Sequence, residues 1–212
     1  MAEIPTQTRN LSELGLTAQA GRKATVTGLV LDSRDTVDGS LFAALPGARV
    51  HGGEFIQYAL RMGASAVLTD TEGARIAKAE LAAWDGALIV AEDPRASLAG
   101  AAALWFGAQP ENMVAVTGTN GKTTTTYLIH HIMKDVWRRA GLLGTIKFDD
   151  GFNESEATHT TPGAVKMHKI LRQMADNECR GVAMEVSSHG LEQHRVGGVN
   201  FDVGVFSNLT QD

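Results

Sequence analysis

The sequence has 212 residues, 43% of them hydrophobic, and a formal net charge of −5. This length suits one large domain or two modest ones. A nucleic-acid partner favours a concentrated basic face, whereas no cationic run here is longer than a pair such as Arg138-Arg139. No apolar run approaches the roughly 20 residues that span a bilayer. We therefore expect neither a nucleic-acid partner nor a membrane partner.

The N-terminal residues and the single cysteine bear on the compartment. The start, Met1-Ala2-Glu3-Ile4-Pro5, lacks the basic and apolar stretches of a secretory signal. Cys179 has no second cysteine to pair with and suits a reducing compartment. We expect a cytoplasmic protein, and we expect it to be a monomer.

Short apolar segments alternate with helical segments in the first half of the chain. The alternation predicts an α/β architecture whose sheet is at least partly parallel. Gly107 ends an alanine-rich helix and a turn-like stretch at 109–112 follows, so we predict two domains, 1–108 and 109–212. The predicted strands cover 24–31, 41–45, 64–69 and 87–91, and the predicted helices cover 55–62, 74–84 and 95–106.

The second predicted domain starts with a strand, a glycine loop and a helix from about Lys122. Thr161-Pro162 predicts another helix start, with the Thr161 hydroxyl as N-cap and Pro162 at the first helical position. A doubly wound nucleotide-binding domain has five or six strands, and this sequence predicts about four, at 113–116, 142–148, 181–186 and 202–206. We therefore expect a doubly wound P-loop domain that is truncated at its C-terminal side.

The loop Gly118-Thr119-Asn120-Gly121-Lys122-Thr123 predicts binding of nucleotide phosphates, with ATP as the expected nucleotide. Glycines allow a tight turn that points successive N–H groups at an anion, and the helix N-terminus adds partial positive charge. Lys122 supplies a charge for the outer phosphates, and the Thr123 hydroxyl can ligate Mg²⁺. The usual motif has a glycine where this chain has Val116, so the loop is a shortened variant. A glycine-rich turn without a ligand is the alternative interpretation.

Glu185 ends the apolar strand predicted at 181–186. In phosphate-loop folds an acid at the end of a neighbouring strand holds the metal ion or its water. A surface glutamate at a strand end is the alternative, and the presence of the phosphate loop favours the metal-binding role.

Polar residues follow Glu185 closely, in Ser187-Ser188-His189-Gly190 and Gln193-His194-Arg195. Loops at the carboxyl ends of strands are where α/β proteins bind ligands. Metal ligation by His189 and His194 is disfavoured, because a lone histidine is more often a structural hydrogen-bonding group. His159-Thr160-Thr161 allows helix capping, a ligand contact or both.

Two other polar segments each allow two interpretations. His130-His131 lies inside the helix after the glycine loop and is interpreted as an exposed or packing pair. Asp32-Ser33-Arg34 follows a predicted strand. This turn could face a ligand, or Asp32 and Arg34 could pair with each other.

Several segments together resemble one family, the Mur ligases. The loop and its flanks, Thr117 to Thr125, resemble the family's ATP loop, and segments 184–191 and 193–196 resemble the member that adds the third amino acid to the peptidoglycan precursor. Segments 32–34 and 39–44 resemble the family's uridine-diphosphate-binding domain. Segment 201–212 resembles the strand that leads to a family histidine.

The resemblance implies an ATP-dependent amide ligase. It would add meso-diaminopimelate, in preference to L-lysine, to UDP-N-acetylmuramoyl-L-alanyl-D-glutamate through an acyl phosphate. The family carries a histidine just after the position of Asp212, then a carbamylated lysine and a third domain, so we expect this chain by itself to bind ligands without completing the ligation. The alternatives are a non-catalytic nucleotide- or sugar-nucleotide-binding module and a phosphate-loop kinase or hydrolase.

The resemblance also implies site residues. His159 departs from the asparagine that family members often carry. ATP would be bound by Gly118, Thr119, Asn120, Gly121, Lys122, Thr123 and Thr124, with Lys122 and Glu185 catalytic and Thr123 and Glu185 holding Mg²⁺. The substrate would be bound by Leu31, Ser33, Ala48, Arg49, Val50, His159, Thr160, Thr161, Ser187, Gln193 and Arg195.

Overall fold

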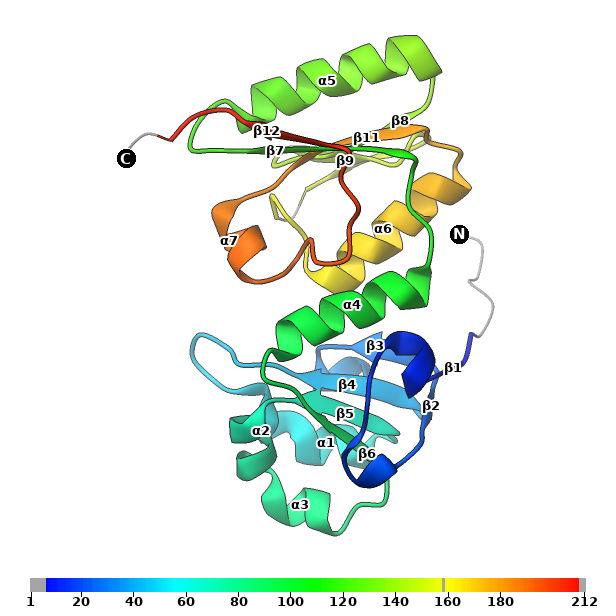
Figure 1. The fold of residues 1–212 in the computed structure, drawn as a ribbon, viewed down its shortest axis with the longest axis vertical. Helices are drawn as coiled ribbons and strands as arrows, with labels where there is room; N and C mark the ends of the chain where they lie inside the picture. Colours follow the sequence, from blue (N-terminus) through cyan, green and yellow to red (C-terminus); the bar gives the residue numbers. More distant parts are fainter. Residues whose placement is uncertain (1–6, 158, 210–212) are drawn as a thin grey trace. The chain divides into compact units, whose positions relative to one another are not determined.

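The computed structural model describes residues 7–157 and 159–209. The chain divides into two compact units, Met1–Trp105 and Phe106–Asp212 (Figure 1). Within the described residues, no helix combines the length and the apolar character needed to cross a membrane. Each unit is built around its own β-sheet.

The first unit contains a parallel four-stranded sheet in the order β3-β4-β5-β6. Helices α1 to α3 lie on the face opposite α4 (Figure 1). The strands are β3 (Gly28–Val30), β4 (Ser40–Ala44), β5 (Ala66–Thr69) and β6 (Ala87–Val90), and the helices are α1 (Ile56–Arg61), α2 (Thr71–Ile76), α3 (Lys78–Ala82) and α4 (Pro94–Phe106). A separate antiparallel pair joins β1 (Arg9–Asn10) and β2 (Thr25–Val26), and short 3-10 helices cover Leu11–Leu14, Gln19–Gly21, Ser33–Asp35 and Gly52–Phe55.

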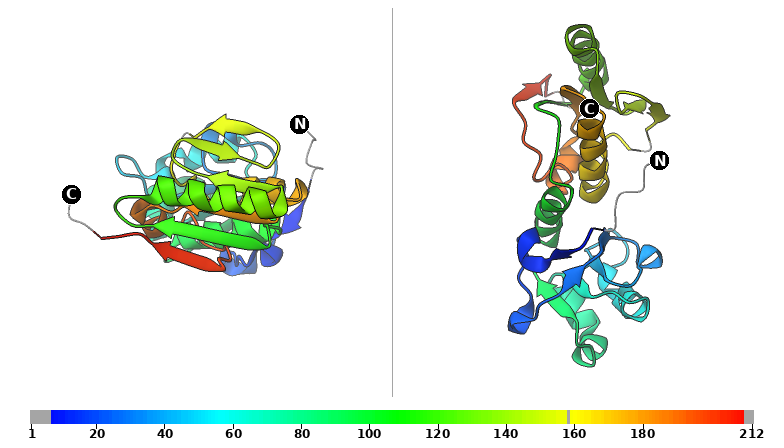
Figure 2. Two further views of the ribbon diagram at one scale, coloured as in Figure 1. Left: turned by 90° about the horizontal axis from the view of Figure 1, so that it is seen from above. Right: turned by 90° about the vertical axis from the view of Figure 1, so that its right-hand side faces the viewer.

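The second unit contains a six-stranded sheet in the order β10-β9-β8-β11-β7-β12. The strands β8, β11, β7 and β12 are parallel, and β9 and β10 extend one edge as an antiparallel hairpin (Figure 2). The strands are β7 (Asn112–Thr117), β8 (Ala140–Leu143), β9 (Lys147–Asp149), β10 (Glu154–Glu156), β11 (Gly181–Glu185) and β12 (Val203–Phe206), and the helices are α5 (Lys122–Trp137), α6 (Ala164–Asp176) and α7 (Ser188–Glu192).

Helices α5 and α6 cover opposite faces of this sheet (Figure 1). Side chains of a strand point alternately to its two faces, so β7 contributes Met113 to the core under α6 and Val114 to the core under α5. Helix α6 fills the first core with Met167, Leu171 and Met174, all fully buried. The α/β architecture predicted from the sequence, with parallel sheets and a doubly wound second unit, is confirmed.

Three predicted elements prove to be divided. The strand predicted at 142–148 is the end of β8, a turn at 144–146 and the start of β9, and a bond from Gly144 N to Lys147 O of 3.2 Å closes the turn. The strand predicted at 24–31 is β2 and β3, which pair with different neighbours. The helix predicted at 74–84 is α2 and α3, because the backbone leaves helical geometry at the buried Ala77 (φ −98°, ψ 26°).

The predicted helix start at Thr161-Pro162 is also wrong. Helix α6 begins at Ala164, and Gly163 is its N-cap, with no side-chain capping bond. Thr161 is buried instead, and its hydroxyl bonds to the residues that end β11. The Thr161 hydroxyl therefore makes tertiary hydrogen bonds instead of capping the helix as the local sequence predicts.

Candidate functional site

The glycine loop connects β7 to α5, as the sequence predicts. Gly118 has φ +125° and Gly121 has φ +81°, both in the region that favours glycine. An added Cβ at Gly118 would overlap Ser207 Oγ and lie 2.8 Å from Asn208 O, whereas one at Gly121 meets nothing within 4 Å. Gly118 therefore permits close packing inside the protein, and Gly121 leaves open space at the start of α5.

Lys122 is the first residue of α5, and its side chain folds back over the loop. Its Nζ donates to Gly118 O at 2.7 Å and to Thr119 O at 2.9 Å. The first N–H groups of a helix have no intrahelical partner, and the helix dipole makes this end positive. The loop therefore presents an ammonium group and helix-terminal amides at one place, which is the arrangement that binds phosphate.

Glu185 lies beside the start of α5 because β11 and β7 are parallel neighbours that pair Glu185 with Val116. Its side chain is buried. Glu185 Oε2 accepts from Thr123 Oγ1 at 3.0 Å and from Thr145 Oγ1 at 3.0 Å, and its Oε1 accepts from Thr145 N at 2.9 Å. The predicted pair, Thr123 and Glu185, is therefore brought into direct contact.

The donor set at Thr123 and Glu185 fits Mg²⁺. This ion prefers oxygen ligands and is usually held by one or two protein groups, with phosphate oxygens and waters completing the octahedron. A buried carboxylate and a hydroxyl 3.0 Å apart meet that requirement at the end of the sheet where the phosphate loop begins.

A second polar cluster lies at the carboxyl end of β11 and contains Thr161, Ser187, Gln193 and Arg195. Thr161 Oγ1 accepts from Ser187 N at 3.1 Å, and Arg195 Nη1 donates to Thr161 O at 2.8 Å. Arg195 Nε and Nη2 donate to Gln193 Oε1 at 3.1 and 2.7 Å. Gly190 is required here, since an added Cβ would lie 2.8 Å from Thr161 Cγ2.

This second cluster joins the first through the turn after β8. Thr145 Oγ1, whose proton is donated to Glu185, accepts from Thr160 Oγ1 at 3.1 Å. The rest of the second cluster is linked to the same residue through Thr161 Oγ1, which donates to Glu185 O at 3.2 Å. His159 lies next to Thr160 in the chain and is exposed.

The remaining histidines occupy different environments. The side chain of His189 is exposed on α7, 3.9 Å from Glu192, and His194 has a positive φ of 52°. Across the described residues, no group of three or more histidine, cysteine or acidic side chains is placed to hold a metal ion. His130 is buried with its Nε2 3.1 Å from Ala140 O, and His131 is exposed.

In the first unit, the predicted substrate residues follow adjacent parallel strands. Leu31 and Ser33 come after β3, and Ala48, Arg49 and Val50 come after β4, so both groups lie at the carboxyl edge of the sheet. Leu31 and Val50 are about half exposed, whereas Ser33 is buried. This edge is where open α/β sheets bind ligands.

Asp32 and Arg34 pair with each other, as one of the two interpretations of the sequence expects. Arg34 Nε donates to Asp32 Oδ1 at 2.9 Å, and Arg34 N donates to the same oxygen at 3.0 Å. The hydrogen bonds from the Arg34 side chain and backbone lower the pKa of Asp32 to about 2.

Sequence reasoning missed three residues of the candidate phosphate site. The strand predicted at 142–148 includes Thr145, although Gly144 between two apolar runs is a signal for a turn. Ser207 and Asn208 follow β12 and contact the loop backbone, but their signal, two polar residues directly after a strand, is weak without the strand order.

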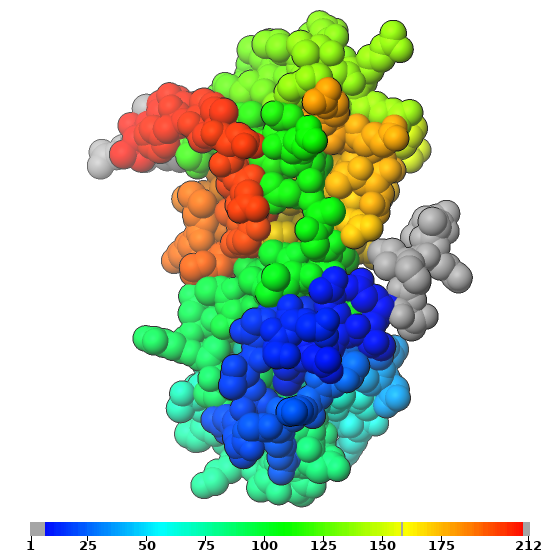
Figure 3. All heavy atoms as spheres, turned by 45° about the vertical axis from the view of Figure 1, so that its right-hand side comes forward, coloured from blue at the N-terminus to red at the C-terminus, as the bar shows by residue number. Residues whose placement is uncertain are grey.

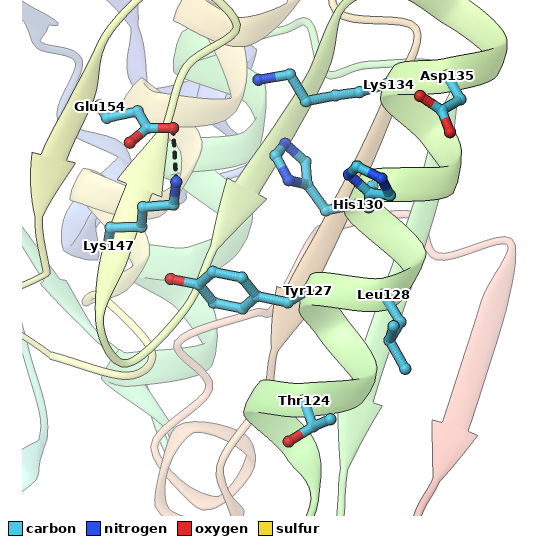
Figure 4. A pocket seen from close by; sticks show the side chains of 9 residues that line it. Thr124, Tyr127, Leu128, His130, Lys134, Asp135, Lys147 and Glu154 are labelled. Carbon is cyan, nitrogen blue, oxygen red and sulfur yellow. Dashed lines mark hydrogen bonds and ion pairs between the residues drawn. The ribbon is translucent and has the colours of Figure 1, made fainter.

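An open pocket of about 620 Å³ lies between α5 and the hairpin β9–β10 (Figure 4). Lys147 Nζ donates to Glu154 Oε1 at 2.5 Å, and Lys134 Nζ donates to Asp149 Oδ2 at 3.0 Å. Burial lowers the pKa of His130 at this pocket. Both lysines are engaged by carboxylates, so the glycine loop is the better phosphate site. The pocket is lined by Thr124, a predicted ATP-binding residue, and by Tyr127, Leu128, His130, His131, Lys134, Asp135, Lys147 and Glu154.

Comparison with known protein families agrees with this geometry. Residues 116–212 match the Mur ligase middle domain, and residues 25–106 match the domain described as Mur ligase family, catalytic domain. A solved structure of a UDP-N-acetylmuramoyl-L-alanyl-D-glutamate--2,6-diaminopimelate ligase superposes with a TM-score of 0.78 at 29% identity, covering 97% of this chain and 41% of that chain.

Curated relatives carry the same name. The ligase of this name from Synechococcus sp. (strain WH7803) is 44% identical over 206 residues, which are 95% of this chain and 41% of the relative. That of Streptomyces avermitilis is 42% identical over 193 residues, 90% of this chain and 37% of the relative. The chain thus spans roughly two fifths of the length of these relatives. Since both matched domains are Mur ligase domains, the chain belongs to the Mur ligase family.

Proposed function

We propose that this chain forms the sugar-nucleotide-binding and ATP-binding units of an amide ligase that acts in the cytoplasm. The ligase would add meso-diaminopimelate to UDP-N-acetylmuramoyl-L-alanyl-D-glutamate during peptidoglycan precursor synthesis. The observation that supports the reaction class is the contact between Thr123, in the first turn after the phosphate loop, and the buried Glu185 at the end of the neighbouring strand. A single buried cysteine is consistent with a reducing compartment.

The phosphate loop would bind the outer phosphates of ATP. Lys122 Nζ is held 2.7 Å from Gly118 O, at the place where the helix-terminal amides converge. These groups neutralise charge on the transferring phosphoryl group and align it with its acceptor, and positioning of this kind accounts for most of the catalysis in phosphoryl transfer.

Thr123 and Glu185 would hold Mg²⁺, and a bound ion would neutralise the charge that develops on the phosphate oxygens. The bonds from Thr145 N and Oγ1 orient the Glu185 carboxylate. Supporting bonds of this kind commonly contribute 10- to 100-fold to metal affinity. Thr145 is therefore part of the proposed site although it touches no phosphate itself.

The second cluster would bind the peptide and phosphate portion of the sugar nucleotide. Arg195 keeps a fixed orientation because Gln193 Oε1 accepts from two of its nitrogens, and a guanidinium is suited to carboxylates and phosphates. The edge formed by Leu31, Ser33 and the loop 48–50 in the first unit would bind the uridine diphosphate.

In the proposed reaction, the terminal carboxylate of the dipeptide attacks the γ-phosphorus of ATP, and the bond to the β-phosphate oxygen breaks to release ADP. The amine of the incoming amino acid then attacks the acyl phosphate carbon, and phosphate leaves as the amide forms. The choice of meso-diaminopimelate over L-lysine is supported by the names of the relatives, both 2,6-diaminopimelate ligases above 40% identity.

The activity test uses the full-length enzyme and measures phosphate release from ATP. We expect release that depends on both UDP-N-acetylmuramoyl-L-alanyl-D-glutamate and meso-diaminopimelate, with L-lysine a poor substitute. Release without an amine acceptor would favour a phosphate-loop kinase or hydrolase instead. Absence of release with either amino acid would contradict the proposal.

The binding test uses this 212-residue chain. Titration calorimetry of Lys122→Ala should show weaker MgATP binding with sugar-nucleotide binding unchanged, and Lys169→Ala, an exposed lysine of α6, is the matched control. Equal loss of both ligands would indicate misfolding or a wrong assignment. Binding of both ligands by an enzyme that never turns over would indicate a non-catalytic module.

A further inference from the structure

Two residues that follow the edge strand β12 lie against the phosphate loop. The parallel register pairs Phe206 with Thr117, which brings the residues after β12 beside the residues after β7. Ser207 N donates to Thr117 O at 2.9 Å and continues the sheet bonding beyond the strands. We call Ser207 and Asn208 the β12 clamp. The segment containing β12 is at the surface of the molecule (Figure 3).

Asn208 makes three hydrogen bonds with two consecutive loop residues. Its backbone O accepts from Thr119 N at 3.0 Å, and its side-chain Oδ1 accepts from Asn120 N at 3.0 Å. Its Nδ2 donates to Asn120 O at 3.1 Å. An asparagine amide offers both a donor and an acceptor. The Asn208 side chain therefore bonds to both the backbone N–H and the backbone C=O of Asn120, as a neighbouring strand would.

Ser207 supports the same peptide and explains the need for glycine at position 118. Ser207 Oγ lies 2.7 Å from Asn120 O and 3.1 Å from Thr117 O, and its single hydroxyl proton is donated to these carbonyls. The clamp approaches the loop so closely that a Cβ at Gly118 would overlap Ser207 Oγ.

The clamp matters because the loop is a shortened variant of the usual motif. Val116 occupies the position of the first glycine of the usual motif, and it is buried within β7, paired with Glu185 on one side and Val205 on the other. The loop therefore starts only at Gly118, and the hydrogen bonds of Asn208 to Thr119 and Asn120 order its backbone. Lys122 depends on that order, because its amine donates to the carbonyls of Gly118 and Thr119.

We propose that Asn208, assisted by Ser207, is a positioning residue for the nucleotide phosphates. The clamp engages the amides of Thr119 and Asn120, so the phosphates are received by Lys122 and by the amides of Gly121, Lys122 and Thr123 at the start of α5. By fixing the Thr119–Asn120 backbone, the clamp also fixes the site of the Lys122 amine. This role rests on the proposed binding of ATP by the loop.

The test measures MgATP binding to this chain by calorimetry and exchange of the Asn120 amide by NMR without nucleotide. Asn208→Ala removes two hydrogen bonds and should raise the Kd for MgATP roughly tenfold, since a net hydrogen bond is worth about 2- to 12-fold. The Asn120 amide should exchange faster, while the amides of Val114 and Ala183 in the sheet stay protected. Asn153→Ala, at an exposed turn residue of the hairpin, is the matched control and should change neither readout.

Unchanged MgATP affinity in Asn208→Ala, with protected sheet amides, would overturn the proposal. If the sheet amides of that variant exchange faster, the Kd for MgATP of Ser207→Ala is the deciding measurement. A several-fold rise in Kd would support the clamp, and an unchanged Kd would overturn it. A wild-type chain that does not bind MgATP overturns the ATP assignment and the clamp's role together. The two failures are distinguishable, because one is seen in the wild type and the other only in the variants.

Discussion

Thr123 and Glu185 are 62 residues apart in the chain, yet Thr123 Oγ1 donates to Glu185 Oε2 at 3.0 Å. The contact arises because β7 and β11 are parallel neighbours whose carboxyl ends meet at one edge of the sheet. The phosphate loop leaves β7 at this edge, and Glu185 ends β11 there. The pair therefore places the predicted metal site directly beside the predicted phosphate site.

Glu185→Gln should weaken Mg²⁺-dependent ATP binding by about tenfold or more. The amide keeps the size of the side chain but removes the negative charge that a divalent cation requires. Calorimetry with ATP at several Mg²⁺ concentrations measures the effect, and Glu156→Gln on exposed β10 is the control. An unaltered Mg²⁺ dependence would remove Glu185 from the metal site.

Gly118→Ala should destabilise the second unit by about 1–3 kcal/mol, the usual cost of an unfavourable backbone conformation. Position 118 has φ +125°, and the new methyl group would overlap Ser207 Oγ. Denaturant unfolding measures the loss. Gly204→Ala is the control, because an added Cβ there meets nothing within 4 Å. Equal stability of the two variants would contradict the predicted strain.

Arg34→Ala should raise the pKa of Asp32 from about 2 toward its ordinary value of 3.8. A lowered carboxyl pKa contributes stability above pH 3.8 that is lost as the pH falls through about 2, so any effect is confined to acid. The pair is exposed, and we expect little change in stability at neutral pH. Carbon NMR titration of the Asp32 carboxyl measures the shift. The pKa of Glu72, lowered by Arg75, should not change.

The stability of the second unit should fall as the pH drops below 6.5. Burial lowers the pKa of His168 in the folded state, although its Nε2 donates to Gly197 O at 2.8 Å. Below 6.5 the unfolded chain therefore binds a proton that the folded chain does not, with a slope of at most about 1.4 kcal/mol per pH unit for one histidine.

Unfolding of His168→Gln at pH 7.5 and 5.5 checks this dependence. The variant should lose part of the pH effect, and His130, whose pKa burial also lowers, should account for the remainder. His131 is exposed and lies next to His130 on α5, so His131→Gln should retain the full pH dependence of stability. A His168→Gln profile identical to that of the wild type would refute the assignment.

The strongest local patterns were sufficient to predict several elements correctly. The helix predicted at 55–62 corresponds to α1 at Ile56–Arg61, and the glycine loop lies between β7 and α5 as predicted. The prediction of one strand at 142–148 is wrong because apolar residues lie on both sides of the turn. With only Gly144 to mark the turn, two short strands and one long strand look alike in the sequence. Thr161 was misread because a hydroxyl before a proline is a capping signal locally, while in the fold β11 provides other partners for it.

The sequence by itself determined the phosphate loop, the carboxylate that follows a buried strand and the α/β class, because these depend on residue type, spacing and periodicity along one segment. Only the tertiary structure decided that Thr145 orients Glu185 and that Ser207 and Asn208 support the loop. These contacts depend on the strand order β8-β11-β7-β12 and its register. Strand order is set by the packing of the whole sheet against α5 and α6, and no single segment of the sequence encodes it.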